Sequence, residues 1–181
     1  MEEESDQEDC EVERPLSQIH EALQRLVGLH RQLLDTVRME REALVQADAP
    51  RIQEATCAKQ ALIEAIRQAE SERLKRTGEL ALLWKKPLRE LTITNIVLAI
   101  QGVDPKSAEQ FRSIQNTLVI MVQRISDQNR DNQTFVERSL EHVKNMKKNV
   151  LGESAPKTNT YTQQGQRSNP VAGARLISKE A

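Results

Sequence analysis

The residues able to do chemistry are three histidines, two cysteines and many carboxylates, and their spacing forms no catalytic or metal-binding motif. His20 is followed by Glu21, but a second histidine does not come four residues later, as a zinc-binding helix requires. His142 has Glu141 beside it and no second ligand. Cys57 has no histidine close in sequence to activate its thiol. Nucleophilic catalysis and metal binding are therefore not expected.

The other polar candidates have ordinary structural explanations. His30 falls within the apolar stripe of a predicted helix, where the expected role is a polar layer that sets helix register. Glu40 and Glu42 are expected to be solvated helical charges. The six glycines are scattered, so no glycine-rich loop could hold a phosphate group. We predict that the protein is not an enzyme, with no catalytic residue, no metal and no cofactor.

The elements that position these residues are predicted to be almost wholly α-helical. Of the 181 residues 29% are charged and 2% aromatic, and there are only six Gly and six Pro. Long charged stretches rich in Ala and Leu are typical of helices, and the scarcity of aromatic side chains indicates a thin core. We predict an all-α fold, with an elongated antiparallel hairpin of coiled-coil type, a long third helix and disordered termini.

The charge is unevenly distributed along the chain. Residues 1–13 hold eight acids and no base, which is typical of a disordered tail, so we assign residues 1–14 to an acidic tail. The rest carries a net charge of +7 with no basic stripe and few aromatic residues, so nucleic acid is not an expected partner. The longest apolar run, Leu91 to Ile100, is too short to span a bilayer. Cys10 and Cys57 are expected to be free, reduced thiols, as is usual in the cytosol. We therefore expect a cytoplasmic protein without stable membrane insertion.

A heptad pattern predicts the first helix, from Pro15 to about Ala47. Proline is favoured in the first turn of a helix. Only His30 and Glu40 depart from apolar character at positions a and d. The apolar members are Leu16, Leu23, Val37 and Leu44 at position a, with Ile19, Leu26 and Leu33 at position d.

A short break at residues 48–50 separates this helix from a second amphipathic helix. Asp48 is a suitable cap and Pro50 would lie in the first turn. So short a connection makes the two helices antiparallel. Pro87 ends the second helix because it lacks a backbone donor. The predicted hairpin covers residues 15–86.

Residues 87–104 are predicted to form a connector with a short helix. Leu91 to Thr94 alternate like a strand, but the sequence offers no partner strand, and a lone strand is not stable. Thr92 or Thr94 would cap the short helix, and Gly102 would end it.

The third helix is predicted over residues 105–151, because Asp104 and Pro105 form a start signal and Gly152 a stop signal. Residues 126–133 contain no apolar side chain, so the helix either continues through a polar layer or breaks in two; we favour the unbroken helix. Residues 152–181 are predicted to be a disordered tail.

The third helix carries two apolar faces at helical spacing. Either it packs on the hairpin as a three-helix bundle, which periodicity alone favours, or it binds a partner helix. The first face comprises Phe111, Ile114, Leu118, Met121, Val122 and Ile125, and the second comprises Val136, Leu140, Val143 and Val150, with Phe135 and Met146 alongside.

Motifs spread over about residues 33–165 resemble the FlgN-like family of flagellar export chaperones. The hairpin holds a Leu pair, then Glu-x-Ala-Leu, Lys-x-x-Leu-Ile and Glu-x-x-Arg. The third helix holds an Asn-x-x-Asn motif followed by two apolar residues, and the tail holds a Thr-Tyr-x-x-x-Gly ending. These motifs are Leu33-Leu34, Glu42-Ala43-Leu44, Lys59 to Ile63, Glu70 to Arg73, Asn129 to Asn132 with Phe135-Val136, and Thr160 to Gly165. The sequence departs from the family at Thr162, where Asp is usual, and at Phe135-Val136, where Leu-Ile is usual.

The resemblance implies a cytosolic chaperone for the hook-associated proteins of the hook–filament junction. By this resemblance the third helix binds the terminal helices of those proteins, and Tyr161 docks on the export gate of the flagellar type III system. The implied cargo-binding set combines the Asn-x-x-Asn motif with apolar residues of the third helix. Its members are Phe111, Ile114, Leu118, Met121, Val122, Ile125, Asn129, Asn132, Phe135, Val136, Leu140 and Val143.

Two other functions fit the same helices. The chain could be a structural adaptor that forms a homodimer through the heptads of its first helix. It could also be a histidine phosphotransfer bundle, for which His20 is the credible acceptor because His30 lies within the apolar stripe. The chaperone is our first hypothesis.

Overall fold

The computed structural model describes the backbone of residues 2–150 and side chains from residue 12 onward, and these residues form helices without any strand. The chain divides into two compact units, residues 1–133 and residues 134–181. The predicted all-α class is confirmed. The predicted tail at residues 152–181 lies outside the described residues. No helix within the described range is both long and apolar enough to cross a bilayer.

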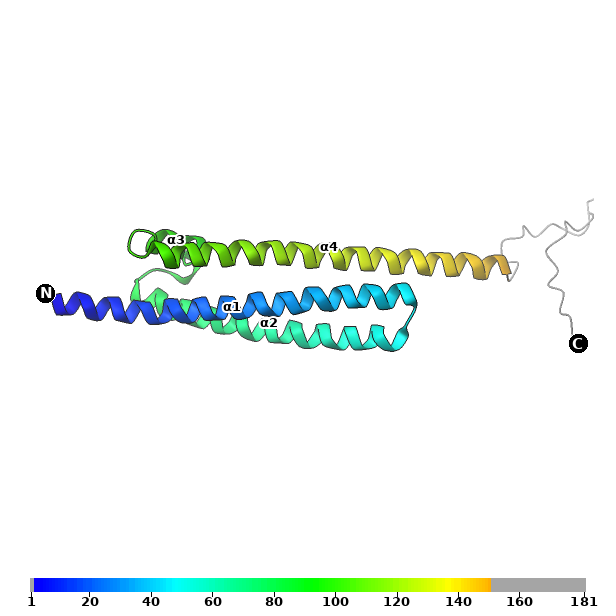
Figure 1. Ribbon diagram of the computed structural model, residues 1–181, viewed down its shortest axis with the longest axis horizontal. Coiled ribbons are helices and arrows are strands. Elements are labelled where there is room, and N and C mark those ends of the chain that lie inside the picture. The colour runs from blue at the N-terminus through cyan, green and yellow to red at the C-terminus, as the bar shows by residue number, and fades with distance from the viewer. Residues whose placement is uncertain (1, 151–181) are drawn as a thin grey trace, which may run out of the picture. The chain divides into compact units, whose positions relative to one another are not determined.

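Helices α1 (Glu2–Gln46) and α2 (Ala49–Leu83) pack side by side as the predicted antiparallel hairpin (Figure 1). Asp48 caps α2, since its carboxylate accepts the backbone N–H of Arg51 at 3.1 Å. Ala47 adopts a positive φ of 53°. The N–H of Ala47 then reaches Leu44 O at 3.2 Å, and the N–H of Asp48 reaches Ala43 O at 3.0 Å. This pair of bonds satisfies the last carbonyls of α1 and turns the chain.

The start of α1 differs from the prediction. The helix begins at Glu2 and contains Pro15, whereas the sequence pattern placed the start at Pro15 after an acidic tail. Glutamate is a good helix former, and carboxylates near a helix N-terminus interact favourably with the helix dipole. The helix of the structure thus begins thirteen residues before Pro15.

The connector contains a 3-10 turn, η1 (Leu88–Glu90), and the short helix α3 (Ile93–Ile100). The Thr92 hydroxyl accepts the N–H of Asn95 at 3.2 Å, which confirms the cap predicted from the sequence. Gln115 of the next helix donates to the Thr94 hydroxyl at 3.0 Å, so α3 is held against that helix.

Helix α4 (Pro105–Val150) is continuous through residues 126–133, as the preferred alternative required. Asp104 caps it, because one carboxylate oxygen accepts the backbone N–H groups of Lys106 and Ser107, each at 3.1 Å. Hydrogen bonds from the Ser107 side chain and backbone lower the pKa of Asp104.

The core of residues 12–133 lies between the hairpin, α3 and the first part of α4. Small residues such as Ala22 and Ala69 are buried where the hairpin helices meet, and small side chains let helix backbones approach closely. Two clusters form this core. The larger includes Ile19, Leu23, Leu26, Leu80, Ile96, Ile100 and Phe111, and the smaller Leu33, Leu34, Val37 and Ile125.

Candidate functional site

The first apolar face of α4 lies against the hairpin. Phe111 and Ile125 are buried in the two core clusters, and Ile114 and Leu118 pack against the larger one. Met121 is half-buried, and Val122 at the edge of this face is exposed. Over residues 105–133 the amphipathic pattern of α4 is therefore that of a packed helical bundle, the alternative that periodicity favoured.

A buried polar layer joins α4 to both helices of the hairpin. Lys59 Nζ donates to both carboxylate oxygens of Glu40, at 2.9 and 2.8 Å. Asn132 Nδ2 donates to Glu40 Oε2 at 3.1 Å and to the backbone carbonyl of Val37 at 3.0 Å. Lys59 also approaches Asn129 Oδ1 at 3.5 Å. Side chains from α1, α2 and α4 thus meet at one level of the bundle.

This layer specifies how α4 sits on the hairpin. The side chain of Glu40 is 13% exposed, that of Lys59 is 22% exposed, and Asn132 is buried. A charge removed from water is tolerated only when it is paired and hydrogen-bonded, so sliding α4 along the hairpin would leave Glu40 underpaired. The layer therefore favours one register, as a buried polar residue does in coiled coils.

Two predicted binding residues, Asn129 and Asn132, consequently belong to an internal network in this structure. The expectation that Glu40 is a solvated charge was wrong, because α4 covers its carboxylate. Its place at position d of the heptad was the signal that could have identified it. Lys59 carried no comparable signal, since a lysine on an amphipathic helix is usually at its solvated edge.

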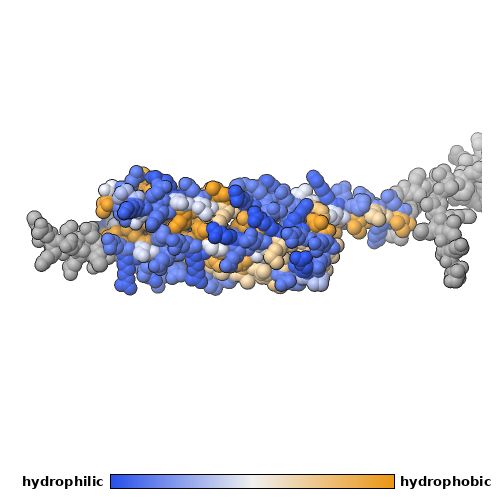
Figure 2. Space-filling model, in the orientation of Figure 1, coloured by the Kyte–Doolittle hydropathy of each residue, from blue (hydrophilic) through white to orange (hydrophobic). Residues whose placement is uncertain are grey.

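The described part of the second unit, residues 134–150, has a different character. Phe135 and Val136 are half-buried, and every side chain from Glu137 to Val150 is exposed. Apolar residues at helical spacing remain on this surface, and Figure 2 shows apolar side chains over this end of α4. The exposed members are Leu140, Val143, Met146 and Val150.

Two of the three histidines make contacts within the fold, whereas His142 is exposed. His20 packs edge-on against Phe111, with ring centroids 5.5 Å apart and planes inclined by 70°. His30 Nδ1 lies 2.7 Å from Leu26 O of its own helix, and this contact joins His30 to no other helix. The polar layer that was predicted at His30 is formed by Glu40 instead. Cys57 is exposed. Among the described residues no three His, Cys, Asp or Glu side chains gather where a metal ion could bind.

The family model described as FlgN protein matches residues 16–169, which is most of the chain. The chain belongs to the FlgN family. It is therefore a flagellar export chaperone in general terms, which confirms the resemblance seen in the motifs. No curated protein and no solved structure gives a significant match.

The ends of the family match do not coincide with the ends of the helices. Residues 1–15 and 170–181 lie outside it, although residues 2–15 continue the helix α1. Tyr161 lies within the match but outside the described residues.

Proposed function

We propose that this protein is a cytoplasmic chaperone that binds hook-associated proteins of the hook–filament junction and delivers them to the flagellar type III export gate. Membership of the FlgN family supports the general activity. One observation carries the assignment of the binding surface: every apolar residue of α4 from Leu140 to Val150 is exposed, whereas Phe111 and Ile125 of the earlier face are buried in the core.

The proposed cargo-binding surface is the set Val136, Leu140, Val143 and Val150. Their successive spacings of four, three and seven residues place them on one side of a helix. Apolar anchors with this spacing bind the apolar face of an amphipathic partner helix. A cargo helix covered in this way cannot associate with other copies of itself, which is the physical basis of chaperone action here.

The buried members of the predicted set have a supporting part in this proposal. Phe111 and Ile125 fix α4 to the hairpin through the core, and Asn132 sets its register through the polar layer. Val122, at the exposed edge of the bundle, remains a proposed cargo contact. Tyr161 is proposed to dock on the export gate, on the strength of the family resemblance of the Thr160–Gly165 segment.

The two rival functions fit the described residues less well. A homodimer through the heptads of α1 needs that stripe to be accessible, but Ile19, Leu23 and Val37 are buried within the chain's own core. The candidate phosphate acceptor His20 is half-buried, and its ring packs edge-on against Phe111. Neither arrangement favours the rival over a chaperone.

Charge placed on the proposed surface tests the assignment. Val143→Glu should abolish co-purification of the hook-associated protein, because a carboxylate cannot enter an apolar helix interface without a partner. Val45→Glu is the matched control, since Val45 and Val143 are both 61% exposed and Val45 lies on the hairpin. Cargo recovery with Val143→Glu equal to that of both Val45→Glu and the unaltered chain would contradict the surface assignment. Loss with both would point to the hairpin as part of the site.

A further inference from the structure

A run of basic and apolar side chains turns the chain from the end of α2 toward α3. Residues 82–89, here called the basic corner, read Leu-Leu-Trp-Lys-Lys-Pro-Leu-Arg and contain no acid. The exposed members of the basic corner are Leu82, Leu83, Lys85, Lys86, Leu88 and Arg89. Leu82 is 81% exposed, the largest exposed fraction among its leucines. Exposed bases and exposed apolar side chains therefore lie next to each other in one short segment.

The bases of the basic corner differ from the arginines that precede them. Each arginine in the second half of α2 forms an ion pair with a glutamate three residues away. These pairs are Arg67–Glu64, Arg73–Glu70 and Arg76–Glu79. Within the described part of the chain, the three bases of the basic corner form no ion pair. Three bases and the acid Glu90 give residues 82–90 a net charge of +2, which attracts an anionic partner.

The backbone holds the two lysines in fixed positions. Lys85 adopts a positive φ of 51°, a conformation that glycine usually supplies at a helix end because it strains other residues. The N–H of Lys85 donates to Leu82 O at 3.2 Å, and the N–H of Lys86 donates to Ala81 O at 3.0 Å. These two bonds end α2. A strained lysine at a position suited to glycine points to a function of its side chain.

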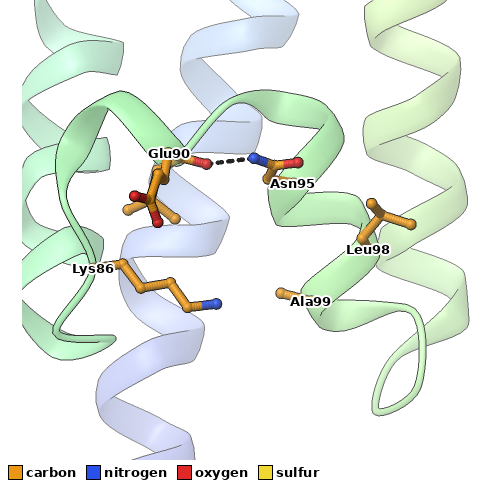
Figure 3. A pocket seen from close by; sticks show the side chains of 6 residues that line it. Lys86, Glu90, Asn95, Leu98 and Ala99 are labelled. Atoms are coloured by element: carbon orange, nitrogen blue, oxygen red, sulfur yellow. Dashed lines mark hydrogen bonds between the residues drawn. The ribbon is translucent and has the colours of Figure 1, made fainter.

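A hollow of about 380 Å³ lies between the basic corner and α3. Figure 3 shows the Lys86 side chain extending toward Ala99 and the Asn95 amide donating to the Glu90 carbonyl at 2.7 Å, which ties the chain after the basic corner to α3. Leu82 lines neither this hollow nor the two others at this end of the first unit. The most exposed leucine of the basic corner therefore lies on open surface and not in a groove.

We propose that the basic corner docks on an anionic phospholipid surface. Lysine and arginine side chains are attracted by anionic headgroups, and leucine and tryptophan side chains enter the boundary between headgroups and acyl chains. A peptide with apolar anchors requires a groove, whereas a bilayer accepts side chains that protrude. The docking is peripheral and reversible. It uses a surface other than the proposed cargo-binding surface, so it does not depend on the cargo assignment.

Co-sedimentation of the full chain with lipid vesicles tests the proposal. Vesicles that contain phosphatidylglycerol should bind the chain, and vesicles of phosphatidylcholine alone should bind it weakly, because the attraction comes from anionic headgroups. Added salt should weaken the binding. Trp84 is the single tryptophan, and its emission should move to shorter wavelength on binding because its ring loses water. Equal binding to the two kinds of vesicle, or binding to neither, would overturn the proposal.

Two pairs of adjacent, exposed lysines provide a matched comparison. Lys85→Gln combined with Lys86→Gln should weaken binding to the anionic vesicles about tenfold or more, since each base near an anionic surface contributes about fivefold. Lys147→Gln combined with Lys148→Gln removes the same charge from the last turn of α4 and should leave the binding nearly unchanged. An equal loss with the two double variants would contradict docking through the basic corner.

Lys85→Gly separates docking from a structural role. Glycine adopts the positive φ without strain, so stability in urea should be unchanged or higher, while binding to anionic vesicles should fall about fivefold because a base is lost. Unchanged vesicle binding would overturn the docking role. Leu82→Ser should also weaken vesicle binding, whereas Val45→Ser, at another exposed apolar residue of the hairpin, should not. A soluble glutamate-rich peptide that binds with the same lysine dependence, while anionic vesicles do not bind, would assign the basic corner to an acidic protein segment instead.

Discussion

The partly buried ion pair between Glu40 of α1 and Lys59 of α2 gives a quantitative test of whether the polar layer is shielded from solvent. A double-mutant cycle with Glu40→Gln and Lys59→Met measures the coupling free energy between the two side chains. Their N–O distance is 2.8 Å. At that distance, with an effective dielectric constant of about 20, the attraction is about 6 kcal/mol. Desolvation of both charges offsets most of it, so we expect a net coupling of about 1.5–3 kcal/mol.

The chain contains a control pair with the same separation. Arg67 and Glu64 also lie 2.8 Å apart, but their side chains are 73% and 54% exposed. Solvent screening and side-chain entropy reduce such a pair to about 0–0.5 kcal/mol. The cycle for this pair uses Glu64→Gln and Arg67→Met.

Urea unfolding followed by circular dichroism at 222 nm supplies the free energies for both cycles. The coupling at Glu40–Lys59 should exceed that at Glu64–Arg67 by about 1 kcal/mol or more, and it should fall less when salt is added, because buried charges are screened less. Couplings that are equal, and equally sensitive to salt, would refute the conclusion that the polar layer is shielded from solvent.

Three further outcomes follow from individual residues. Ala47→Gly should raise the free energy of unfolding by about 0.5–1 kcal/mol in urea, because Ala47 has a φ of 53°, which glycine adopts without strain; a loss of stability would contradict the turn. The carboxyl titration of Asp104, followed by NMR, should have its midpoint below the usual value of about 3.9. Because the pKa is lowered in the folded state, ionised Asp104 stabilises the fold at pH values above the usual pKa. This stabilisation is lost as the pH falls through the lowered pKa. Ser107→Ala should raise the midpoint, and an unchanged midpoint would contradict the hydrogen bond. Tyr161→Ala should weaken binding to the purified export gate protein while leaving cargo co-purification intact, and unchanged gate affinity would contradict the docking role.

Helix positions could be predicted because local signals agreed with the fold. Asp48, Thr92 and Asp104 are capping residues whose side chains accept backbone N–H groups, as their positions before apolar runs suggested. The heptad of α1 was equally informative, since its a and d positions form the core. The start of α1 was missed because proline favours the first turn of a helix, where its backbone donor is not needed, whereas Pro15 lies in the interior of α1, where the missing donor removes a helical hydrogen bond.

The binding site was less predictable, because periodicity reports amphipathicity and not what covers the apolar face. Ile125 and Leu140 look alike in the sequence, yet one is buried in the core and the other is exposed. The contacts of Asn132 with Val37 and Glu40 connect residues more than ninety positions apart, and no local pattern encodes such a pairing. The family motif identified Asn129 and Asn132 as important residues, and the structure buries Asn132 and leaves Asn129 half-buried near Lys59.

The central claim is that exposed apolar residues at the end of α4 bind the cargo, and one comparison tests it most directly. The full chain, Val143→Glu and Val45→Glu should each be co-expressed with a hook-associated protein, and the amount of cargo recovered per chaperone should be measured. We predict full recovery with the unaltered chain and with Val45→Glu, and a loss of tenfold or more with Val143→Glu. Cargo recovery with Val143→Glu equal to that of the unaltered chain would contradict the claim.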